Sequence, residues 1–344
     1  MGRLGGLLEW EMVKETLFQD DGVGRGKPSI LIGNGASVAV SDTFRYEALK
    51  DRADFSAVAQ KLFDEIGTSD FELVLNRLGT AIQVNELHGL DGTAITGTYE
   101  EIRESLVDAV REVHIRNDSY CPETALGDEL PSYSTIYSTN YDLLLYWAIM
   151  KLDCIRDQKI IDMFQGMQFD RAREFSDEST RLMYLHGALH LFLNSQGICC
   201  KRRTHDLSLL EQLDVNGVAR VHFVSEGTSA RKMAKIRSSD YLSYCYEHLQ
   251  NDKNDIVIYG HSLSVDSDKH ILDALLRHPE RMFAVAIHTG GKEEADVLTE
   301  KRGFLAKLGG VDEERVVFFD SSTHPLGFPG QDTPFDAHIE GDDQ

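Results

Sequence analysis

The 344-residue sequence has few cysteines, and no two of them form a Cys-x-x-Cys pair. An odd number of cysteines without such spacing is typical of reduced thiols in a cytosolic protein, and it argues against both a disulfide framework and a cysteine-based zinc module. The five cysteines are Cys121, Cys154, Cys199, Cys200 and Cys245.

Positive charge is also scarce. Lys and Arg number 35 against 57 Asp and Glu, which gives a formal net charge of -22. A surface of this sign repels phosphate backbones, so we expect no direct binding to nucleic acid. The basic cluster at residues 201–203 predicts a solvated loop.

Long apolar runs are missing as well. No run approaches the roughly 20 residues that cross a bilayer, so we expect no membrane partner. The first residues turn acidic too early for a signal peptide, which predicts a cytoplasmic protein. The hydrophobic share of 42% is that of an ordinary globular chain, and the length suits one large domain or two ordinary ones.

Short apolar runs rich in β-branched residues predict buried parallel strands. They lie at residues 29–33, 135–138, 182–185, 221–224, 255–260, 282–287 and 315–319. Amphipathic helical patterns separate them, at residues 55–66, 71–87, 99–115, 141–152, 239–249 and 268–276. This alternation predicts an α/β fold, a doubly wound Rossmann-like parallel sheet of about six or seven strands.

The same patterns predict how the chain is divided. We expect an N-terminal extension over residues 1–28, one α/β domain over 29–324 and a flexible acidic tail over 325–344. Residues 55–131 show helices without a convincing strand and predict a helical insertion over the sheet. The polar stretch at 159–180 predicts a loop with a short helix.

A glycine-rich turn follows the first predicted strand. Its residues are Gly33, Asn34, Gly35, Ala36 and Ser37. Glycines at this place allow the backbone to approach a pyrophosphate, and the next helix would direct its amides toward the charge. A tight strand-to-helix turn with no ligand explains the pattern equally simply, because the third glycine of the dinucleotide fingerprint is replaced by Val38.

Three further polar groups follow predicted strands, where open α/β sheets bind their ligands. Thr139, Asn140 and Asp142 follow the second strand, and Asn140 can hold a ribose hydroxyl or a water, although helix capping is the alternative. His186, before a glycine that permits a sharp turn, is a candidate proton acceptor. With His190 it has zinc-motif spacing, but the glutamate of that motif is missing, so no metal is expected.

The last group is Gly260, His261 and Ser262, at the end of the run 255–260. It is a candidate site for a phosphate or the adenosine ribose. A capped strand-to-helix turn without a ligand is one alternative. A nucleophile elbow, which would indicate an α/β hydrolase, is another. It fails because Ser264 stands where the motif needs a glycine.

Together, in this order, the four groups resemble the sirtuin family over about residues 29–290. The turn at 33–37 looks like the sirtuin glycine-alanine-glycine opening, and Phe44-Arg45 like the phenylalanine-arginine pair that follows it. Residues 139–142 and 186–187 look like the family's glutamine-asparagine-isoleucine-aspartate and catalytic histidine-glycine. Residues 260–263 look like its glycine-threonine-serine-leucine.

The resemblance implies an NAD+ hydrolase that cleaves the nicotinamide–ribose bond. Asn140 would orient the ribose or the attacking water, His186 would accept a proton, and Asp142 would hold the carboxamide. Phe44 would cover the sugar and Arg45 would set the loop. The remaining positions would hold phosphates and adenosine ribose, among them Gly33, Gly35, Ser37 and Ser262, with Asn34, Ala36, Thr139, Gly260 and His261 beside them.

Residues 223–229 and 241–242 look closer to bacterial antiviral sirtuin-like proteins, relatives that degrade NAD during phage infection, some with a HerA-type ATPase. The resemblance thus implies antiphage NAD depletion, a homo-oligomer and an ATPase of that kind as partner. The cysteine pairs of deacetylating sirtuins are missing, which favours hydrolysis over deacylation. An NAD-dependent protein deacylase and a non-catalytic NAD or ADP-ribose sensor stay as alternatives.

Overall fold

A computed structural model of the chain describes residues 6–17, 26–115, 120–174, 176, 178–202, 221–224 and 227–327. The predicted flexible tail lies outside the described residues from 328 onward. So do Arg203 of the basic cluster and residues 225 and 226 of the segment that resembles the antiviral proteins.

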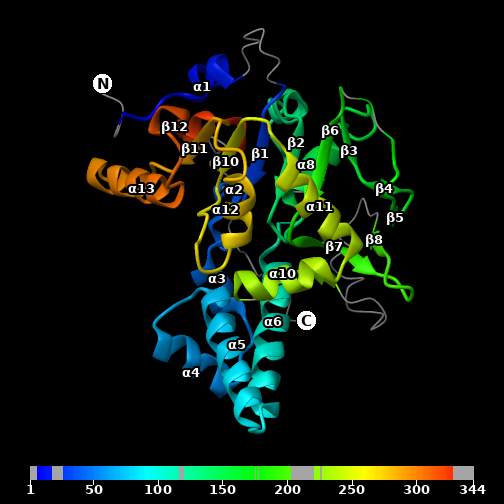
Figure 1. The fold of residues 1–344 in the computed structure, drawn as a ribbon, viewed down its shortest axis with the longest axis vertical. Coiled ribbons are helices and arrows are strands. Elements are labelled where there is room, and N and C mark those ends of the chain that lie inside the picture. The colour runs from blue at the N-terminus through cyan, green and yellow to red at the C-terminus, as the bar shows by residue number, and fades with distance from the viewer. Residues whose placement is uncertain are drawn as a thin grey trace, which may run out of the picture.

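The chain has an α/β fold built on a seven-stranded, all-parallel sheet (Figure 1). The strand order is β12-β11-β10-β1-β2-β6-β3, so the first strand lies at the centre and later strands are added on both sides. This confirms the predicted doubly wound sheet. Its strands are β1 (Ser29–Ile32), β2 (Thr135–Ser138), β3 (Ile160–Asp162), β6 (Thr180–Tyr184), β10 (Ile256–Tyr259), β11 (Phe283–Ile287) and β12 (Val316–Asp320).

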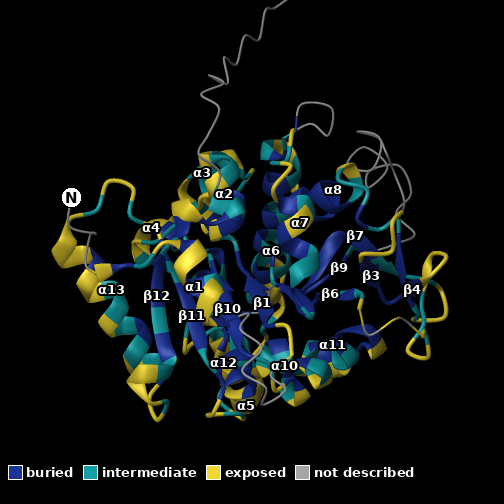
Figure 2. Cartoon of the chain, turned by 90° about the horizontal axis from the view of Figure 1, so that it is seen from above, coloured by how far each residue is buried: buried dark blue, intermediate teal, exposed yellow. Residues whose placement is uncertain are grey.

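Helices cover both faces of this sheet, with α2, α7 and α8 on one side and α11 and α12 on the other (Figure 2). The four residues of β1, β2 and β10 are all buried, as continuous apolar strands between two helical layers require. The helices are α1 (Trp10–Leu17), α2 (Gly35–Val40), α3 (Tyr46–Arg52), α4 (Ala57–Ile66), α5 (Phe71–His88), α6 (Thr93–Val113), α7 (Leu126–Glu129), α8 (Leu144–Lys151), α10 (Ser229–Arg237), α11 (Asp240–Asn251), α12 (Lys269–Leu275) and α13 (Glu294–Lys307).

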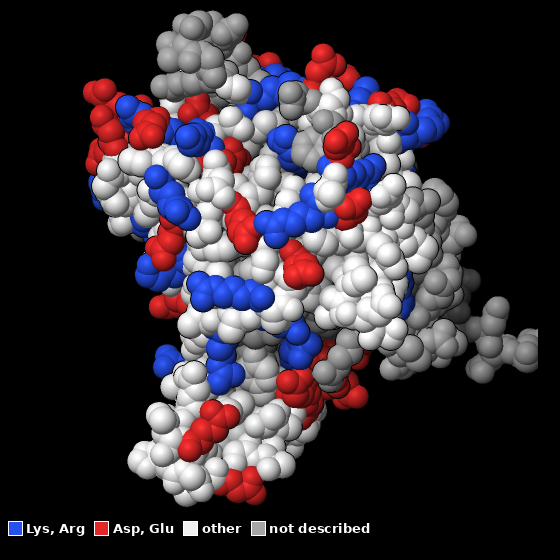
Figure 3. Space-filling model, turned by 45° about the vertical axis from the view of Figure 1, so that its right-hand side comes forward, with Lys and Arg blue, Asp and Glu red and all other residues white. Residues whose placement is uncertain are grey.

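Helices α4, α5 and α6 form the helical insertion, which projects from the sheet (Figure 1). Local signals set the limits of α5: the Asp70 carboxylate accepts the amides of Glu72 and Leu73, and Gly89 ends the helix in the left-handed conformation. The insertion packs on α8 through a hydrophobic core of its own, which includes Phe63, Phe71 and Trp147. On the face drawn in Figure 3, acidic and basic side chains are interspersed over the body, and the projecting helices carry few charges.

A second sheet corrects two sequence predictions. It is antiparallel, in the order β4-β5-β8-β7-β9. The stretch 159–180, predicted as a loop with a short helix, contains β3 of the parallel sheet and two strands of the second sheet. Residues 221–224 contribute an antiparallel strand of the second sheet, not a parallel one. The strands are β4 (Phe164–Gln165), β5 (Gln168–Phe169), β7 (Gly187–Leu193), β8 (Cys199–Lys201) and β9 (Val221–Phe223).

Lys201 overturns the prediction of a solvated basic loop. It is buried in β8, and its ammonium pairs with the carboxylate of Asp162 at the end of β3. Arg173 also donates to Asp162. Lys201 therefore joins the two sheets, because a buried charge requires a partner of opposite sign.

None of the helices among the described residues is long and apolar enough to cross a membrane.

The N-terminal helix α1 is attached to the sheet through the buried His324. Trp10 of α1 packs on this ring with a centroid distance of 4.6 Å. Nδ1 of His324 lies 3.0 Å from the Leu326 amide and accepts its hydrogen, and Nε2 lies 3.0 Å from the Tyr133 hydroxyl. These bonds use the neutral ring, since a protonated Nδ1 can accept nothing.

Buried neutral histidines of this kind predict loss of stability in mild acid. Burial lowers the pKa of His190 and His324 to about 3 and that of His222, His248 and His270 to about 4. The unfolded chain, with histidine pKa values of about 6.5, takes up these protons first, so stability falls as the pH drops from 6.5 toward 4. Each such histidine contributes about 1.4 kcal/mol per pH unit in that window.

Urea unfolding at pH 7.5, 6.5 and 5.5 measures this loss. His324→Gln should reduce the slope of stability against pH, whereas His88→Gln, at an exposed position, should leave it unchanged. A free energy of unfolding that stays constant over this range would contradict the prediction.

Candidate functional site

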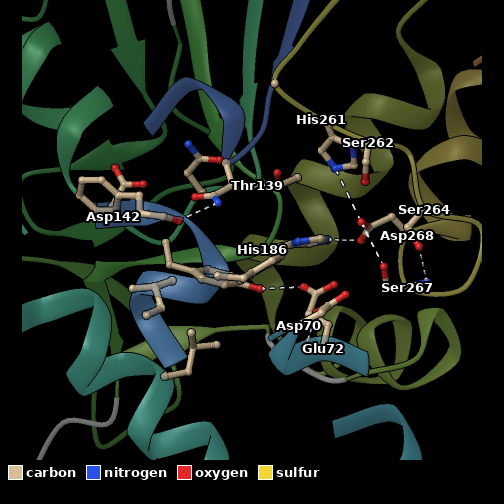
Figure 4. A pocket seen from close by; sticks show the side chains of 18 of the residues that line it. Asp70, Glu72, Thr139, Asp142, His186, His261, Ser262, Ser264, Ser267 and Asp268 are labelled. Carbon is tan, nitrogen blue, oxygen red and sulfur yellow. Dashed lines mark hydrogen bonds and ion pairs between the residues drawn. The ribbon is translucent and has the colours of Figure 1, made fainter. Parts of the chain in front are cut away.

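A pocket of about 280 Å³ lies at the carboxyl ends of β1, β2, β6 and β10 (Figure 4). It occupies the crevice where the strand order reverses around β1, as expected for an open parallel sheet. The insertion closes one side through residues of α5 and α6. Of the residues predicted from sequence, the pocket lining includes Asn34, Phe44, Thr139, Asn140, Asp142, His186, Gly260, His261 and Ser262.

A larger pocket of about 950 Å³ lies beside it, over the ends of β10, β11 and β12. The two pockets share the backbone segment Gly260, His261 and Ser262. Gly35 and Arg45, both predicted from sequence, line this second pocket together with Lys307. Its position gives a ligand room to extend from one pocket into the next.

The glycines of the turn after β1 have a packing role in this structure. The amides of Gly33 and Gly35 donate to the carbonyl oxygens of Tyr259 and Gly260, so they are already used within the protein. A Cβ on either glycine would lie 2.6 Å from an atom of Gly260. Close contact between the β1 and β10 turns explains these glycines without a phosphate, and Gly33, Ala36 and Ser37 lie outside the lining of both pockets.

Ser37 instead forms a hydrogen bond with Asn140 from outside the pocket lining. Its hydroxyl donates to Oδ2 of Asp142 over 2.5 Å, and the Asn140 amide nitrogen donates to Ser37 Oγ over 2.8 Å. Since the hydroxyl has a single hydrogen and gives it to the carboxylate, Asn140 must present its NH2 group to Ser37. The Asn140 Oδ1 atom is then buried without a hydrogen-bond partner among the described residues.

Asp142 is held on both oxygens. Oδ2 accepts from Ser37, and Oδ1 accepts the amide of Leu144 over 2.9 Å at the start of α8. The carboxylate is therefore positioned to orient Ser37 and Asn140. Its predicted contact with a carboxamide stays a prediction.

His186 follows β6 and lies in the same pocket as Asn140. The next residue, Gly187, has a φ of +73°, and a Cβ there would overlap the carbonyl oxygen of His222, so only glycine fits this turn. Burial and the nearby Lys232 ammonium hold the pKa of His186 well below its ordinary value. The ring is therefore neutral at physiological pH and can accept a proton.

The buried Lys232 ammonium joins two walls of the pocket. Its Nζ lies 2.9 Å from Oε1 of Glu72 on α5 and 2.9 Å from Oδ1 of Asp268 before α12. Burial opposes its charge, but the two carboxylates raise its pKa, whereas burial and the charges of Asp268 and Asp70 raise the pKa of Glu72 despite the pairing with Lys232. One buried cation thus faces two carboxylates in the wall of the pocket.

Sequence reasoning missed these charged residues. Asp70 and Glu72 stand at the start of a predicted helix, where acidic residues are common for capping alone. Asp268 and His270 lie at the start of α12 and are both buried. The Asp-x-His pattern after a predicted strand was the one sequence feature that could have indicated them. The sequence around Lys232 does not distinguish it from a lysine on the protein surface.

Among the described residues, one group has metal-ligand character: His186, Asp268 and His270 offer three atoms within 4.8 Å of one another. The Lys232 ammonium is bonded to the carboxylate of this group. Because the Lys232 ammonium already neutralises the Asp268 carboxylate, that carboxylate has little charge left to offer a metal ion. We therefore interpret the group as a hydrogen-bonded cluster and not as a metal centre.

Residues 30–324 match the family described as Domain of unknown function (DUF4917). The chain belongs to this family. The match begins within β1 and ends at His324, so it contains the smaller pocket, the insertion and all of the larger pocket's lining except Gly327. A search of curated proteins finds no match. The family description names no activity, so the sirtuin resemblance stays a prediction for this DUF4917 chain.

The Lys232 cluster of this DUF4917 chain yields a stability prediction. Lys232→Met should lower the free energy of unfolding by about 3–5 kcal/mol, because it leaves Glu72 and Asp268 buried without their cation. The double variant Lys232→Met with Glu72→Gln should recover part of this loss. Urea denaturation at pH 7.5 measures both.

Lys269→Met is the matched control. Lys269 pairs with Asp273 on the exposed side of α12, and exposed pairs contribute at most about 1 kcal/mol. Equal losses of unfolding free energy in the two lysine variants would show that Lys232 does not neutralise the two buried carboxylates as proposed.

Proposed function

We propose that this chain is an NAD+ hydrolase that cleaves the bond between nicotinamide and ribose. The C1′–N1 bond breaks, and its electron pair passes to the pyridinium nitrogen, so that nicotinamide leaves neutral. A water oxygen bonds to C1′, and the proton of that water leaves with a base. NAD+ and water thus give nicotinamide, ADP-ribose and a proton.

The observation that carries the proposal is the unpartnered Oδ1 of Asn140. A buried acceptor without a partner costs about 1–3 kcal/mol of free energy, unless a ligand hydroxyl or a water donates a hydrogen bond to it. Asn140 lines the same pocket as the neutral His186. A ribose hydroxyl or an attacking water between an acceptor and a base is the ligand that suits this pair.

The charges that line the smaller pocket suit the cationic end of NAD+. Four carboxylates line the smaller pocket, and the Lys232 ammonium in its wall offsets part of their charge, so the excess of negative charge favours a cationic pyridinium ring. Arg45 and Lys307 line the larger pocket together with Asp42 and Glu300, and the two basic side chains are the groups there that can contact the anionic pyrophosphate. The carboxylates belong to Asp70, Glu72, Asp142 and Asp268.

The residues of the pocket supply a simple mechanism. Departure of nicotinamide develops positive charge on the ribose, which the surrounding carboxylates stabilise by preorganised electrostatics. Asn140, fixed by Ser37, orients the hydroxyl or water, and His186 accepts its proton. Phe44 is buried in the lining and limits water beside the sugar.

The biological setting proposed here rests on the resemblance alone. It is depletion of NAD in bacterial antiphage defence, by a homo-oligomer that acts with a HerA-type ATPase. The projecting α5 and α6 helices would then be accessible to a partner, because Leu87 and Leu90 are exposed near their tip.

Substitution of the two central residues tests the activity. Asn140→Ala and His186→Ala should each lower nicotinamide release by about 100-fold or more, because each removes a positioned group from the transition state. Chromatography of nicotinamide and ADP-ribose after incubation of the purified chain with NAD measures this. Asn251→Ala and His88→Ala, far from the pocket on α11 and at the end of α5, are matched controls that should keep full turnover.

Two results would overturn the proposal. Binding of NAD by calorimetry without any product would favour a sensor. Nicotinamide release only in the presence of an acyl-lysine peptide would favour a deacylase.

A further inference from the structure

His270 lies behind His186 and does not line the pocket. It belongs to α12 and is buried, and its Nε2 atom lies 3.0 Å from Nε2 of His186. On its other side, Nδ1 lies 3.0 Å from the hydroxyl oxygen of Ser229 at the start of α10. The same oxygen accepts the His270 backbone amide over 2.9 Å. A chain of hydrogen bonds thus leads from Ser229 through His270 to His186.

The donors and acceptors in this series of hydrogen bonds are fixed once His186 acts as a base. Nε2 of His186 faces His270, so the nitrogen left for a substrate proton is Nδ1, which has no hydrogen-bond partner among the described residues. For Nδ1 to accept, the hydrogen of the neutral ring must sit on Nε2 and point to His270. His270 Nε2 must then be an acceptor, and its own hydrogen must sit on Nδ1.

Ser229 completes this arrangement. Its oxygen has two lone pairs, and they accept the His270 Nδ1–H and the His270 backbone N–H. The two bonds fix the ring orientation and the tautomer of His270 together. The arrangement matches the logic of a catalytic triad, where a third group holds the base in its productive tautomer.

Asp268 cannot fix the tautomer of His186. Its Oδ1 atom is 3.9 Å from Nε2 of His186, beyond hydrogen-bond range, and it is bonded to Lys232 instead. The Lys232 charge also disfavours a cationic His186. The charge of Asp268 favours the imidazolium that forms during the reaction, whereas the bond to His270 fixes the position of the Nε2 hydrogen.

We propose that His270, held by Ser229, is a positioning residue that keeps the His186 hydrogen on Nε2 and leaves Nδ1 free as the base. The inference rests on the proposed hydrolysis of NAD+, since it assigns His186 its catalytic nitrogen. The proton that leaves the water binds Nδ1, and the positive charge is shared through the Nε2–H bond to His270. No further reactant is required.

Kinetics of the full chain test the proposal. His270→Ala should lower kcat by about 10- to 100-fold, the usual cost of losing a partner that orients a histidine, while KM changes less than about twofold. Ser229→Ala should lower kcat less, and Ser229→Thr should restore it because the hydroxyl is kept. His222→Gln is the matched control, because the His222 side chain forms a similar buried pair with Ser239, at 2.8 Å, and lies outside the lining of both pockets.

Nitrogen-15 spectra of labelled histidine provide a readout that a general loss of stability would not mimic. The wild-type chain should show the Nε2–H tautomer for His186, and His270→Ala should shift it toward a mixture. An unchanged tautomer together with a wild-type kcat in His270→Ala would overturn the inference while leaving NAD+ hydrolysis intact.

Two other results are distinguishable from this one. If the wild-type chain releases no nicotinamide, the proposed function fails, and the tautomer of His186 still decides whether His270 orients it. Stoichiometric binding of zinc by calorimetry, abolished in His270→Ala, would overturn the inference in favour of a metal centre at the histidine pair.

Discussion

The pairing of one buried ammonium with two carboxylates holds the pocket together. Lys232 comes from α10, Glu72 from the helical insertion and Asp268 from the loop before α12, so one charge cluster connects three separate parts of the chain. A buried lysine is tolerated only if its charge is matched, and each carboxylate in turn depends on the lysine. The neutral state of His186 follows partly from the same cluster, since Lys232 opposes a second positive charge nearby.

The sheet and the convergence of Asn140 with His186 could be predicted from the sequence for one physical reason. Continuous apolar strands buried between helices pair in parallel, and parallel strands bring their carboxyl ends to one edge. Residues that follow β2 and β6 must then meet at that edge, whatever their separation along the chain. The prediction needed only the strand positions, which the runs of β-branched residues indicate well.

Other features depend on packing that local patterns do not encode. Residues 221–224 are as apolar as a core strand, but they pair with β7 in the antiparallel sheet. Lys201 becomes buried only because Asp162 ends the neighbouring β3. Similarly, the glycines of the first turn suggested a phosphate loop, whereas contact with the backbone of Gly260 accounts for them. In each case the deciding partner lies far away in sequence.

The origin of Glu72 limits how this fold can be shortened. Because α5 both projects from the body and supplies a carboxylate to the buried lysine, excision of residues 55–131 would not yield a minimal catalytic core. It would remove one wall of the pocket, expose the apolar face of α8 and leave an ammonium half neutralised in the interior. The helical segment is thus an integral part of the architecture rather than a detachable module, and chains that lack it would need a different residue at position 232.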